Sequence, residues 1–334
     1  MRIDVHAHYW AAEYLDRLTE LGRPDLARAG RQRDDLDERL AEMDRVGVDV
    51  QIFSAIGLNT VMPTAAGALE GARCINDIYV EVRERFGGRF TGFGSVPLPF
   101  VEEAIAESDR CLGELGLAGI ALPCSVDGVP IDDERFEPFW ENLARHDAVV
   151  YVHPVGGDST PHPGLADWGL SMAYGSPTQV AVAAERMVWS GLTYRHPSLR
   201  LIFAMCGGTL PLIWTRHETN LLRGLRSTAA GAVGARFFDF LRGLPIDERD
   251  PMAGLRRFWY DTSVQDIPTA MLLARQSYGV DRLLLGSDSV FASLTEAVEY
   301  IRDNPHLSES EKDAILDRNA QSLLRLPELG GAVR

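Results

Sequence analysis

The sequence has a shortage of positive charge. It carries 33 Lys and Arg residues against 48 Asp and Glu residues, for a formal net charge of −15. A protein this negative repels phosphate backbones and anionic lipid surfaces, so we expect neither a nucleic acid nor a membrane as partner. An anionic small-molecule substrate would need a local positive charge, and a bound metal ion would supply one.

Long hydrophobic runs and clustered cysteines are also missing. No stretch approaches the roughly 18 apolar residues of a membrane helix, and the first residues, MRIDVHAHYW, carry no basic-then-apolar signal pattern. The four cysteines show no CxxC spacing: Cys74, Cys111, Cys124 and Cys206. We therefore expect reduced thiols and a cytoplasmic protein.

Short β-rich runs alternate with longer amphipathic segments along all 334 residues. The runs predicted as strands are 2–6, 48–54, 90–97, 119–123, 149–154, 199–206, 258–263 and 282–288. The predicted helices are 35–46, 66–86, 101–115, 133–146, 178–195, 210–225, 266–278, 294–303 and 308–325. Such alternation implies parallel strands with crossover helices. Eight units, with no GxGxxG or GxxxxGK[ST] turn, favour a (β/α)₈ TIM-type barrel over a doubly wound sheet.

No linker divides the chain, so residues 1–334 are predicted to form a single domain. Three segments exceed a minimal barrel. Residues 9–33 and 155–176 are long loops after strands one and five, and 226–256 is an insertion between strands six and seven. Loops that follow strands lie on the catalytic face of a barrel, so the first two are candidates for substrate cover.

Two histidines stand at the end of the first predicted strand. Side chains of a strand alternate, so Asp4, His6 and His8 are expected on one face, with Ile3 and Val5 on the other. Two imidazoles at positions i and i+2 can converge on one metal ion. An HxH pair alone also occurs by chance on surfaces.

Two further candidates end apolar strands. His153 closes the run VVYVH, where the alternative interpretation is a hydrogen-bonded core histidine. Asp288 follows LLLGS, where a buried carboxylate needs a partner. A helix N-cap is the alternative for Asp288.

Strands one, five and eight would together bring four ligands to the catalytic rim: His6, His8, His153 and Asp288. Three imidazoles, a carboxylate and an open water position indicate one divalent ion. Zn²⁺ is favoured, with Mn²⁺ or Fe²⁺ as alternatives.

The sequence resembles the amidohydrolase-related family, in the branch of aminocarboxymuconate semialdehyde decarboxylase and γ-resorcylate decarboxylase. The resemblance rests on IDVHAHYW, VYVHP, SGLTYRHPSLRLIFAMCGGTLP, WYDTS, LLLGSD and NAQSLLRL, and spans nearly the whole chain. It implies the same barrel, the same four metal ligands and a homodimer.

One position departs from this family's pattern. The family usually has His-x-Gly-Gly-x-x-Pro after strand six, where this chain has Met205 followed by CGGTLP. A thioether neither gives nor takes a proton at neutral pH. Met205 is interpreted first as an apolar substrate contact. The alternatives are a soft metal ligand and a catalytically altered relative. Cys206 is expected to point away from Met205 if the strand continues, as a buried, inert thiol.

The resemblance favours a non-oxidative decarboxylase of a small aromatic or unsaturated acid, with Asp288 as metal ligand and proton donor and His153 in the catalytic set. Decarboxylation tolerates Met205 better than hydrolysis, which usually needs a base to activate water. The alternatives are a hydrolase or hydratase of a small lactone or amide, and a non-catalytic binding protein.

Several residues are predicted near a flat, unsaturated substrate. Predicted contacts are Tyr9, Trp10, Trp168, Met205, Phe291 and His162, the last from the loop after strand five. His162 and His217 are also candidates to replace the missing family histidine. His146 and His196 are predicted to be structural.

Overall fold

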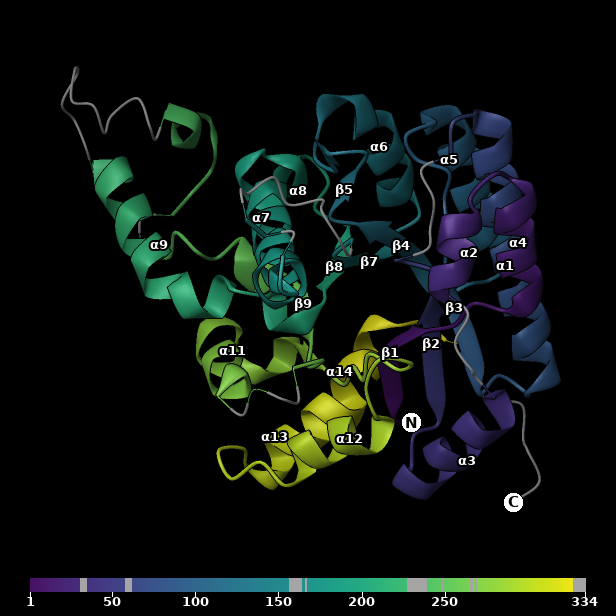
Figure 1. Cartoon of the computed structure of the whole chain (residues 1–334). Helices are drawn as coiled ribbons and strands as arrows, with labels where there is room; N and C mark the ends of the chain where they lie inside the picture. Colours follow the sequence, from purple (N-terminus) through teal and green to yellow (C-terminus); the bar gives the residue numbers. More distant parts are fainter. Residues whose placement is uncertain are drawn as a thin grey trace.

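Eight parallel strands lie side by side in chain order and form a nearly closed barrel (Figure 1). The computed structural model describes residues 1–30, 35–57, 62–155, 164–165, 167–226, 239–247, 249–264, 267 and 269–326. The barrel strands are β1 (Ile3–His8), β2 (Val50–Ser54), β3 (Phe90–Gly94), β4 (Gly119–Pro123), β7 (Val149–His153), β8 (Arg200–Phe203), β9 (Trp259–Asp261) and β10 (Leu283–Leu284). The predicted (β/α)₈ barrel is confirmed.

Helices connect the strands and cover the outside of the barrel (Figure 1). Along the chain they are α1 (Ala12–Glu20), α2 (Pro24–Gly30), α3 (Leu36–Val46), α4 (Ala65–Arg85), α5 (Val101–Asp109), α6 (Glu137–Arg145), α7 (Ser176–Trp189), α8 (Leu192–Arg195), α9 (Leu210–Arg226), α11 (Ala270–Tyr278), α12 (Leu294–Arg302), α13 (Glu309–Asp313) and α14 (Asn319–Leu323). None of the described helices combines the length and the hydrophobicity needed to cross a bilayer.

Helix α4 shows why this layer packs so closely on the strands. Its buried face includes Ile75 and Tyr79, and a Cβ atom on Gly92 of β3 would lie 2.1 Å from the Tyr79 ring. Only glycine leaves room for that ring, so the glycine in β3 sets the distance between helix and sheet.

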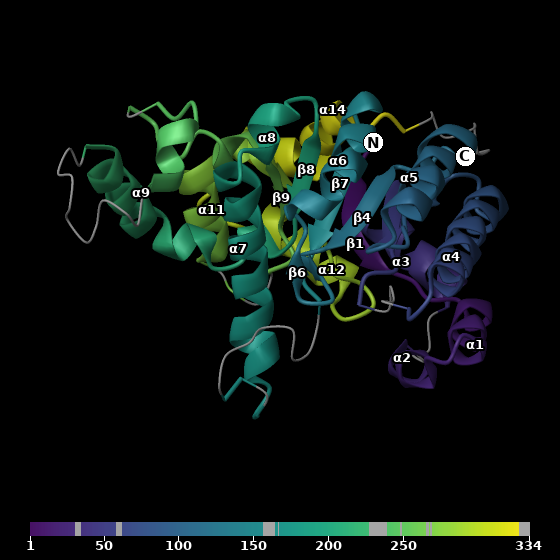
Figure 2. The ribbon, with the colours of Figure 1, turned by 90° about the horizontal axis from the view of Figure 1, so that it is seen from above.

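The connection after β1 is more ordered than the expected loop. It contains α1, which buries Tyr14, Leu15 and Leu18, and the shorter α2. In Figure 2, α1, α2 and the start of α7 project from the same side of the molecule. A short hairpin, β5 (Ser125–Val126) and β6 (Val129–Pro130), was not predicted. The segments 155–176 and 226–256 are described only in part.

The buried apolar side chains form two clusters, one inside the barrel and one between the strands and the helices around them. The inner cluster contains Ile3, Val5, Tyr151 and Ile202, with Leu323 of α14. The outer cluster joins the other strand faces, such as Ala7 and Phe53, to the helices. Apolar packing on both faces explains why the strands read as nearly continuous hydrophobic runs.

Strand β1 does not keep strict alternation. Val5 belongs to the inner cluster and Ala7 to the outer one, and the pairing of β1 with β2 shifts register between Asp4 and Ala7. This irregularity turns His6 and His8 inward, whereas Asp4 bonds Gln51 on the helix side. The prediction that Asp4 shares a face with the two histidines is therefore wrong, because a bulge reverses the alternation.

The barrel closes where β1 meets the segment after β10. The contacts are an isolated bridge between Ala7 and Ser289 and backbone hydrogen bonds from Val5 N to Leu285 O (3.0 Å) and from Asp288 N to His6 O (2.8 Å). Regular strand ends at Leu284, earlier than predicted, and Asp288 adopts a left-handed conformation with φ of 60°. We call this junction the seam.

Candidate metal centre at the carboxyl end of the barrel

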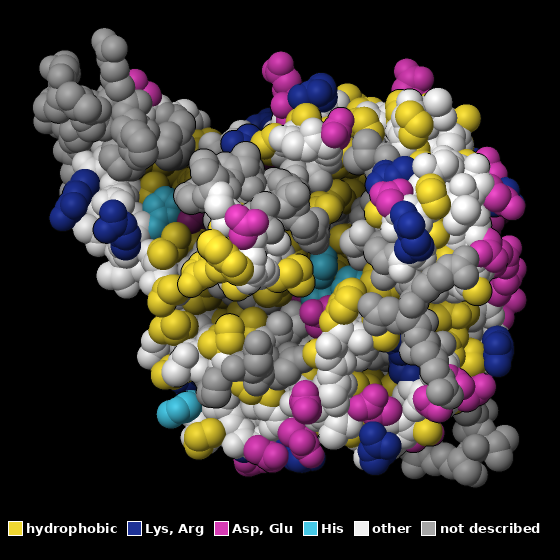
Figure 3. All heavy atoms as spheres, viewed as in Figure 1, with side chains coloured by type: hydrophobic (Ala, Val, Ile, Leu, Met, Phe, Trp, Pro, Cys, Tyr) yellow, Lys and Arg dark blue, Asp and Glu magenta, His cyan; other side chains and the backbone are white. Residues whose placement is uncertain are grey.

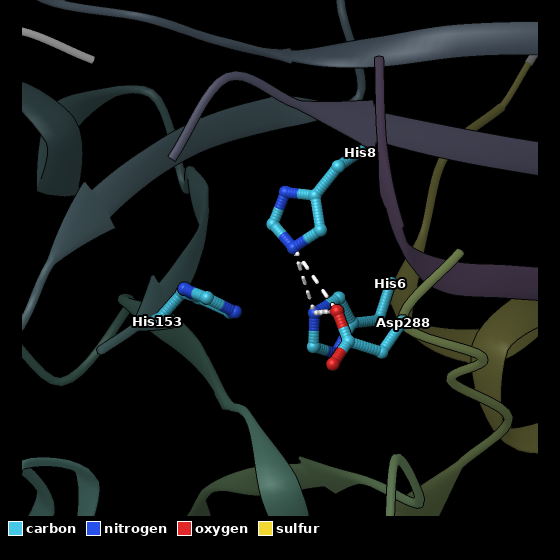
Figure 4. Close-up of side chains that lie close together, drawn as sticks. All are labelled: His6, His8, His153 and Asp288. Carbon is cyan, nitrogen blue, oxygen red and sulfur yellow. Dashed lines mark hydrogen bonds and ion pairs between the residues drawn. The ribbon is translucent and has the colours of Figure 1, made fainter. Parts of the chain in front are cut away.

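Four side chains from three separate strand ends converge on one point. His6 and His8 come from β1, His153 ends β7, and Asp288 follows β10 (Figure 4). One potential ligand atom from each lies within 4.8 Å of the other three. The structure thus brings together the four residues that the sequence placed on the catalytic rim.

The carboxylate of Asp288 lies between the two β1 histidines. Its Oδ1 atom is 3.2 Å from Nε2 of His6 and 3.2 Å from Nε2 of His8. This oxygen is buried and makes no hydrogen bond within the described part of the chain. The two Nε2 atoms face each other at 3.3 Å. Two imidazole nitrogens and a carboxylate oxygen gathered this closely fit a cation, and this donor set suits a divalent metal ion.

The other ring nitrogen of each histidine is held by a neighbouring oxygen. Nδ1 of His6 lies 3.0 Å from the Asp261 carboxylate, and Nδ1 of His153 lies 2.7 Å from the Pro154 carbonyl. Nδ1 of His8 lies 3.4 Å from the Ser54 hydroxyl. With Nδ1 as the donor to these oxygens, each Nε2 keeps its lone pair toward the centre, as metal-binding histidines do.

Asp261 is a site residue that the sequence reasoning missed. It is fully buried at the end of β9, and its carboxylate accepts hydrogen bonds from Tyr151 Oη (3.0 Å), Ser263 Oγ (2.6 Å) and the Met205 backbone N–H (3.1 Å). A Cβ on Gly286 would approach Asp261 to 2.7 Å. The available signal was the same as for Asp288: an acidic residue ending an apolar strand, within WYDTS.

Burial and charge fix the protonation of the cluster. Burial lowers the pKa of His8 and of His153, so both imidazoles are neutral at neutral pH. Burial alone would raise the pKa of Asp288, but His6 and His8 hold it well below its usual value. Against the effect of burial, Asp261 and Asp288 raise the pKa of His6 to about 10. The positive charge that these carboxylates draw to His6 is one that a metal ion would supply instead.

Aromatic side chains border one side of the cluster. The indole of Trp10 stacks on His8 at 5.3 Å between ring centroids, and Phe291 meets the His8 ring edge-on at 5.4 Å. Trp10 is fixed by its Nε1–H bond to Ala55 O, whereas Phe291 is 60% exposed. Figure 3 shows histidine side chains at the bottom of a hollow with hydrophobic side chains around it. A flat, apolar ligand fits such a wall.

The other described residues that were predicted to contact substrate have different surroundings. Trp168 is 90% exposed, and Tyr9 packs on Phe53 in the outer layer at 5.1 Å. His162 lies outside the described residues. Met205 is partly buried and packs against both hydrophobic clusters. Its backbone bond to Asp261 ties it to the network that holds His6.

The chain turns at Met205 instead of continuing as strand. Strand β8 ends at Phe203, and both Met205 and Cys206 have left-handed φ angles of 57° and 52°. Cys206 was expected to point away from Met205 if the strand continued. Because the strand ends before Met205, that expectation does not apply. Cys206 is buried, and burial raises the pKa of its thiol, in agreement with an inert cysteine.

His217 on α9, and His146 and His196 directly after α6 and α8, pair with carboxylates outside the cluster. His217 of α9 pairs with Glu185 of α7 at 2.5 Å, so the structure does not bring it to the site as a replacement for the family histidine. His146 pairs with Asp109 and His196 with Glu137, each at 2.8 Å. These contacts agree with structural roles for His146 and His196.

Known proteins resemble this chain over nearly all its length. The amidohydrolase family model matches residues 3–326. The 2-amino-3-carboxymuconate-6-semialdehyde decarboxylase of Dictyostelium discoideum is 30% identical over 298 residues, covering 87% of this chain and 77% of that protein. A γ-resorcylate decarboxylase of Polaromonas is 27% identical over 304 residues, covering 87% of each chain.

Solved structures share the fold. The dihydroxybenzoic acid decarboxylase of Polaromonas, with bound manganese and the inhibitor 2-nitroresorcinol, superimposes with a TM-score of 0.74 at 24% identity, covering 96% of each chain.

Proposed function

The chain belongs to the amidohydrolase family, and from that premise we propose that it is a metal-dependent, non-oxidative decarboxylase of a small aromatic or unsaturated carboxylic acid. The observation that carries the proposal is the inward convergence of His6, His8, His153 and Asp288, with Asp288 Oδ1 buried and without a hydrogen-bond partner among the described residues. The two relatives described above are named as decarboxylases, which supports this chemistry over others on the same fold.

We propose that these four residues hold one divalent ion, with Zn²⁺ favoured and Mn²⁺ as the first alternative. Three neutral imidazoles and a carboxylate suit Zn²⁺, and the Polaromonas decarboxylase holds manganese. When bound, the ion supplies the positive charge that fixes an anionic substrate beside Asp288 in this negatively charged protein.

Asp288 is the proposed acid of the reaction. It takes up a proton from the bound substrate's acidic hydroxyl or from water and delivers it to the carbon that carries the carboxylate. The new carbon–hydrogen bond takes an electron pair from the unsaturated system of the substrate. When the carbon–carbon bond breaks, its electron pair returns to that system, and CO₂ leaves. His153 completes the proposed catalytic set by fixing the same region of substrate.

The proposed substrate contacts are Trp10 and Phe291, which stand against His8, together with Met205, Trp168 and His162. A thioether at Met205 offers an apolar surface and no proton-transfer group. This favours decarboxylation, in which Asp288 alone moves the proton, over hydrolysis of a lactone or amide.

We further propose a homodimer. Large apolar side chains are exposed on the helical turn Ser171–Gly175, directly before α7, and on α9: Met172 (64%), Tyr174 (62%) and Leu212 (74%). Exposed apolar patches of this kind mark protein interfaces. All four cysteines are free thiols, which supports the proposed cytoplasmic location.

The test is elemental analysis of the purified chain and of its Asp288→Ala variant, followed by a CO₂-release screen. Hydroxybenzoates and amino- or hydroxymuconates are the substrates. We expect about one zinc or manganese per chain, lost in the variant, and CO₂ from at least one acid. Products formed in H₂¹⁸O separate the classes, because a hydrolase or hydratase incorporates the label. Metal-free protein after incubation with Zn²⁺ and Mn²⁺, or label without CO₂, would overturn the proposal.

A further inference from the structure

Asp4 is a fully buried carboxylate that the proposed reaction does not use. Its Oδ1 atom accepts the backbone N–H groups of His6 (3.1 Å) and Ser287 (3.0 Å). Its Oδ2 atom accepts Ser287 Oγ–H (2.6 Å) and Gln51 Nε2–H (2.8 Å). These four donors are uncharged groups. Burying a carboxylate is costly, so a residue placed here is expected to do something that an apolar side chain cannot.

The two backbone groups that Asp4 binds belong to the two sides of the seam. His6 sits in the β1 irregularity, where the register shift removes it from the regular ladder with β2. Ser287 directly precedes Asp288, beyond the end of β10. One carboxylate oxygen therefore connects the backbone of one proposed metal ligand to the residue before another.

A second set of contacts carries this network to His8. The Oε1 atom of Gln51 accepts a hydrogen bond from Arg39 (3.1 Å), and two nitrogens of the Arg39 guanidinium each bond the His8 carbonyl at 3.1 Å. Arg39 and Gln51 are buried. The helix side of β1 is thus fixed at His6 through Asp4 and at His8 through Arg39.

We propose that Asp4 is a positioning residue, which sets the spacing between His6 and Asp288 by binding both segments of the seam. This inference rests on the proposed metal-dependent function. Backbone pairing across the seam is irregular, because β1 is bulged and Asp288 is left-handed, so the side chain of Asp4 adds contacts that a regular ladder would supply. Metal sites need their ligands held within about 0.5 Å of the working geometry, so loss of this contact is felt as weaker binding.

Two variants of the full chain test this role with Co²⁺ as the probe. Asp4→Asn keeps one oxygen for the two backbone donors but turns an NH₂ group toward the Gln51 amide. We expect Co²⁺ affinity, measured by competition with a chelator, to fall about 10- to 100-fold, with a changed Co²⁺ absorption spectrum. Adding Gln51→Glu supplies an acceptor for that NH₂ group and keeps an oxygen toward Arg39. The double variant is therefore expected to recover most of the affinity and the wild-type spectrum.

A matched exchange elsewhere separates positioning from general stability. Asn142 of α6 is also buried, and it donates to Ser108 and Asp109 of α5. Asn142→Asp makes the same amide–carboxylate exchange in the outer layer, and we expect Co²⁺ affinity to stay at the wild-type value. If Asp4→Asn does not fold, Ser287→Ala replaces it, with a smaller drop in affinity expected.

The outcomes are distinct. Wild-type affinity and spectrum in folded Asp4→Asn (or in Ser287→Ala, where that variant replaces it), or no recovery in the folded double variant, overturn the role of Asp4 and leave the metal site intact. Failure of the wild-type chain to bind Co²⁺ overturns the proposed function and this inference with it.

Discussion

The histidines inside the barrel and those on its outer helices make the same contacts with different results. His6 lies 3.0 Å from Asp261, and His196 lies 2.8 Å from Glu137. Both side chains of the inner pair are 0% exposed, whereas those of the outer pair are 13% and 35% exposed. In water an ion pair of this kind contributes little. Inside the barrel, the contact with Asp261 orients the His6 ring, so that the other ring nitrogen faces the centre of the cluster.

A histidine–carboxylate contact alone therefore does not identify a metal site. What distinguishes the inner set is a second carboxylate, Asp288, on the opposite side of the ring from Asp261. Among the described residues, the outer histidines His146 and His217 each pair with one carboxylate, that of Asp109 and that of Glu185. Metal binding is supported where one ring nitrogen of a histidine is held by a carboxylate and the other ring nitrogen faces a second carboxylate.

Removing the charge of Asp288, the carboxylate that faces the centre of the cluster, should have the largest effect. Asp288→Asn takes away both the charge that attracts the ion and the proposed proton donor. We expect CO₂ release to fall by about 10³-fold or more, near the upper range for one acid–base group, with metal content reduced. Glu137→Gln is the matched exchange on the outer set and should leave both quantities unchanged. Wild-type turnover in Asp288→Asn would contradict its assignment as the acid.

Removing the charge of Asp261, the carboxylate that holds Nδ1 of His6, should have the next largest effect. Asp261→Asn keeps the shape but weakens the hold on His6 Nδ1, and we expect metal affinity to drop about 10- to 100-fold. Titration with Co²⁺ measures the change. Glu185→Gln, beside His217, is the outer control and is expected to bind Co²⁺ as the wild type does. Equal affinities for Asp261→Asn and Glu185→Gln would remove the difference between the inner and outer sets.

Much of the fold was predictable because most barrel strands are rich in apolar residues and are followed by helical segments. Helix α1 was missed, although its buried Tyr14, Leu15 and Leu18 follow a helical spacing. The bulge in β1 was not predictable, because the residues between Asp4 and Ala7 carry no local signal for it. The strand was expected to alternate strictly, and only the register with β2 shows that it does not.

The four-residue cluster was predictable for a general reason: barrel strands end on one rim, so chemistry-bearing residues at strand ends meet. Asp261 ends β9 in the same way, but its role depends on a contact with His6, which is 255 residues earlier in the chain. The left-handed turn at Met205 also escaped prediction, because Met is an unusual residue for positive φ.

Restoring the histidine of the family pattern at position 205 should have a smaller effect on CO₂ release. Met205→His places a titratable group next to the inner network, and its backbone N–H can still bind Asp261. Histidine tolerates the left-handed region better than methionine, so we expect no loss of stability. Because Asp288 moves the proton without it, CO₂ release should change less than about tenfold. A gain of about 10²-fold would show that the missing histidine limits turnover.

The smallest effect is expected at the outer pair itself. Arg195, and then His196, hold the pKa of Glu137 at about 2 against an ordinary value of 4.5. The pKa of Glu137 is lower in the folded state, so its charge stabilises the folded protein. This contribution to the free energy of unfolding is complete above about pH 4.5 and is lost as the pH falls toward 2. The side chain is 35% exposed, so solvent screening limits the contribution to about 1 kcal/mol or less.

Thermal unfolding of Glu137→Gln tests this directly. At neutral pH the variant should melt about 1–4 °C below the wild type, and the gap should narrow as the pH falls below the ordinary pKa of a glutamate. Co²⁺ affinity should not change at any of these pH values. A gap that stays constant on acidification would mean that the Glu137 charge does not act through Arg195. A loss of Co²⁺ affinity would mean that the outer ion pairs are coupled to the barrel interior, and the two sets of histidines would then not be independent.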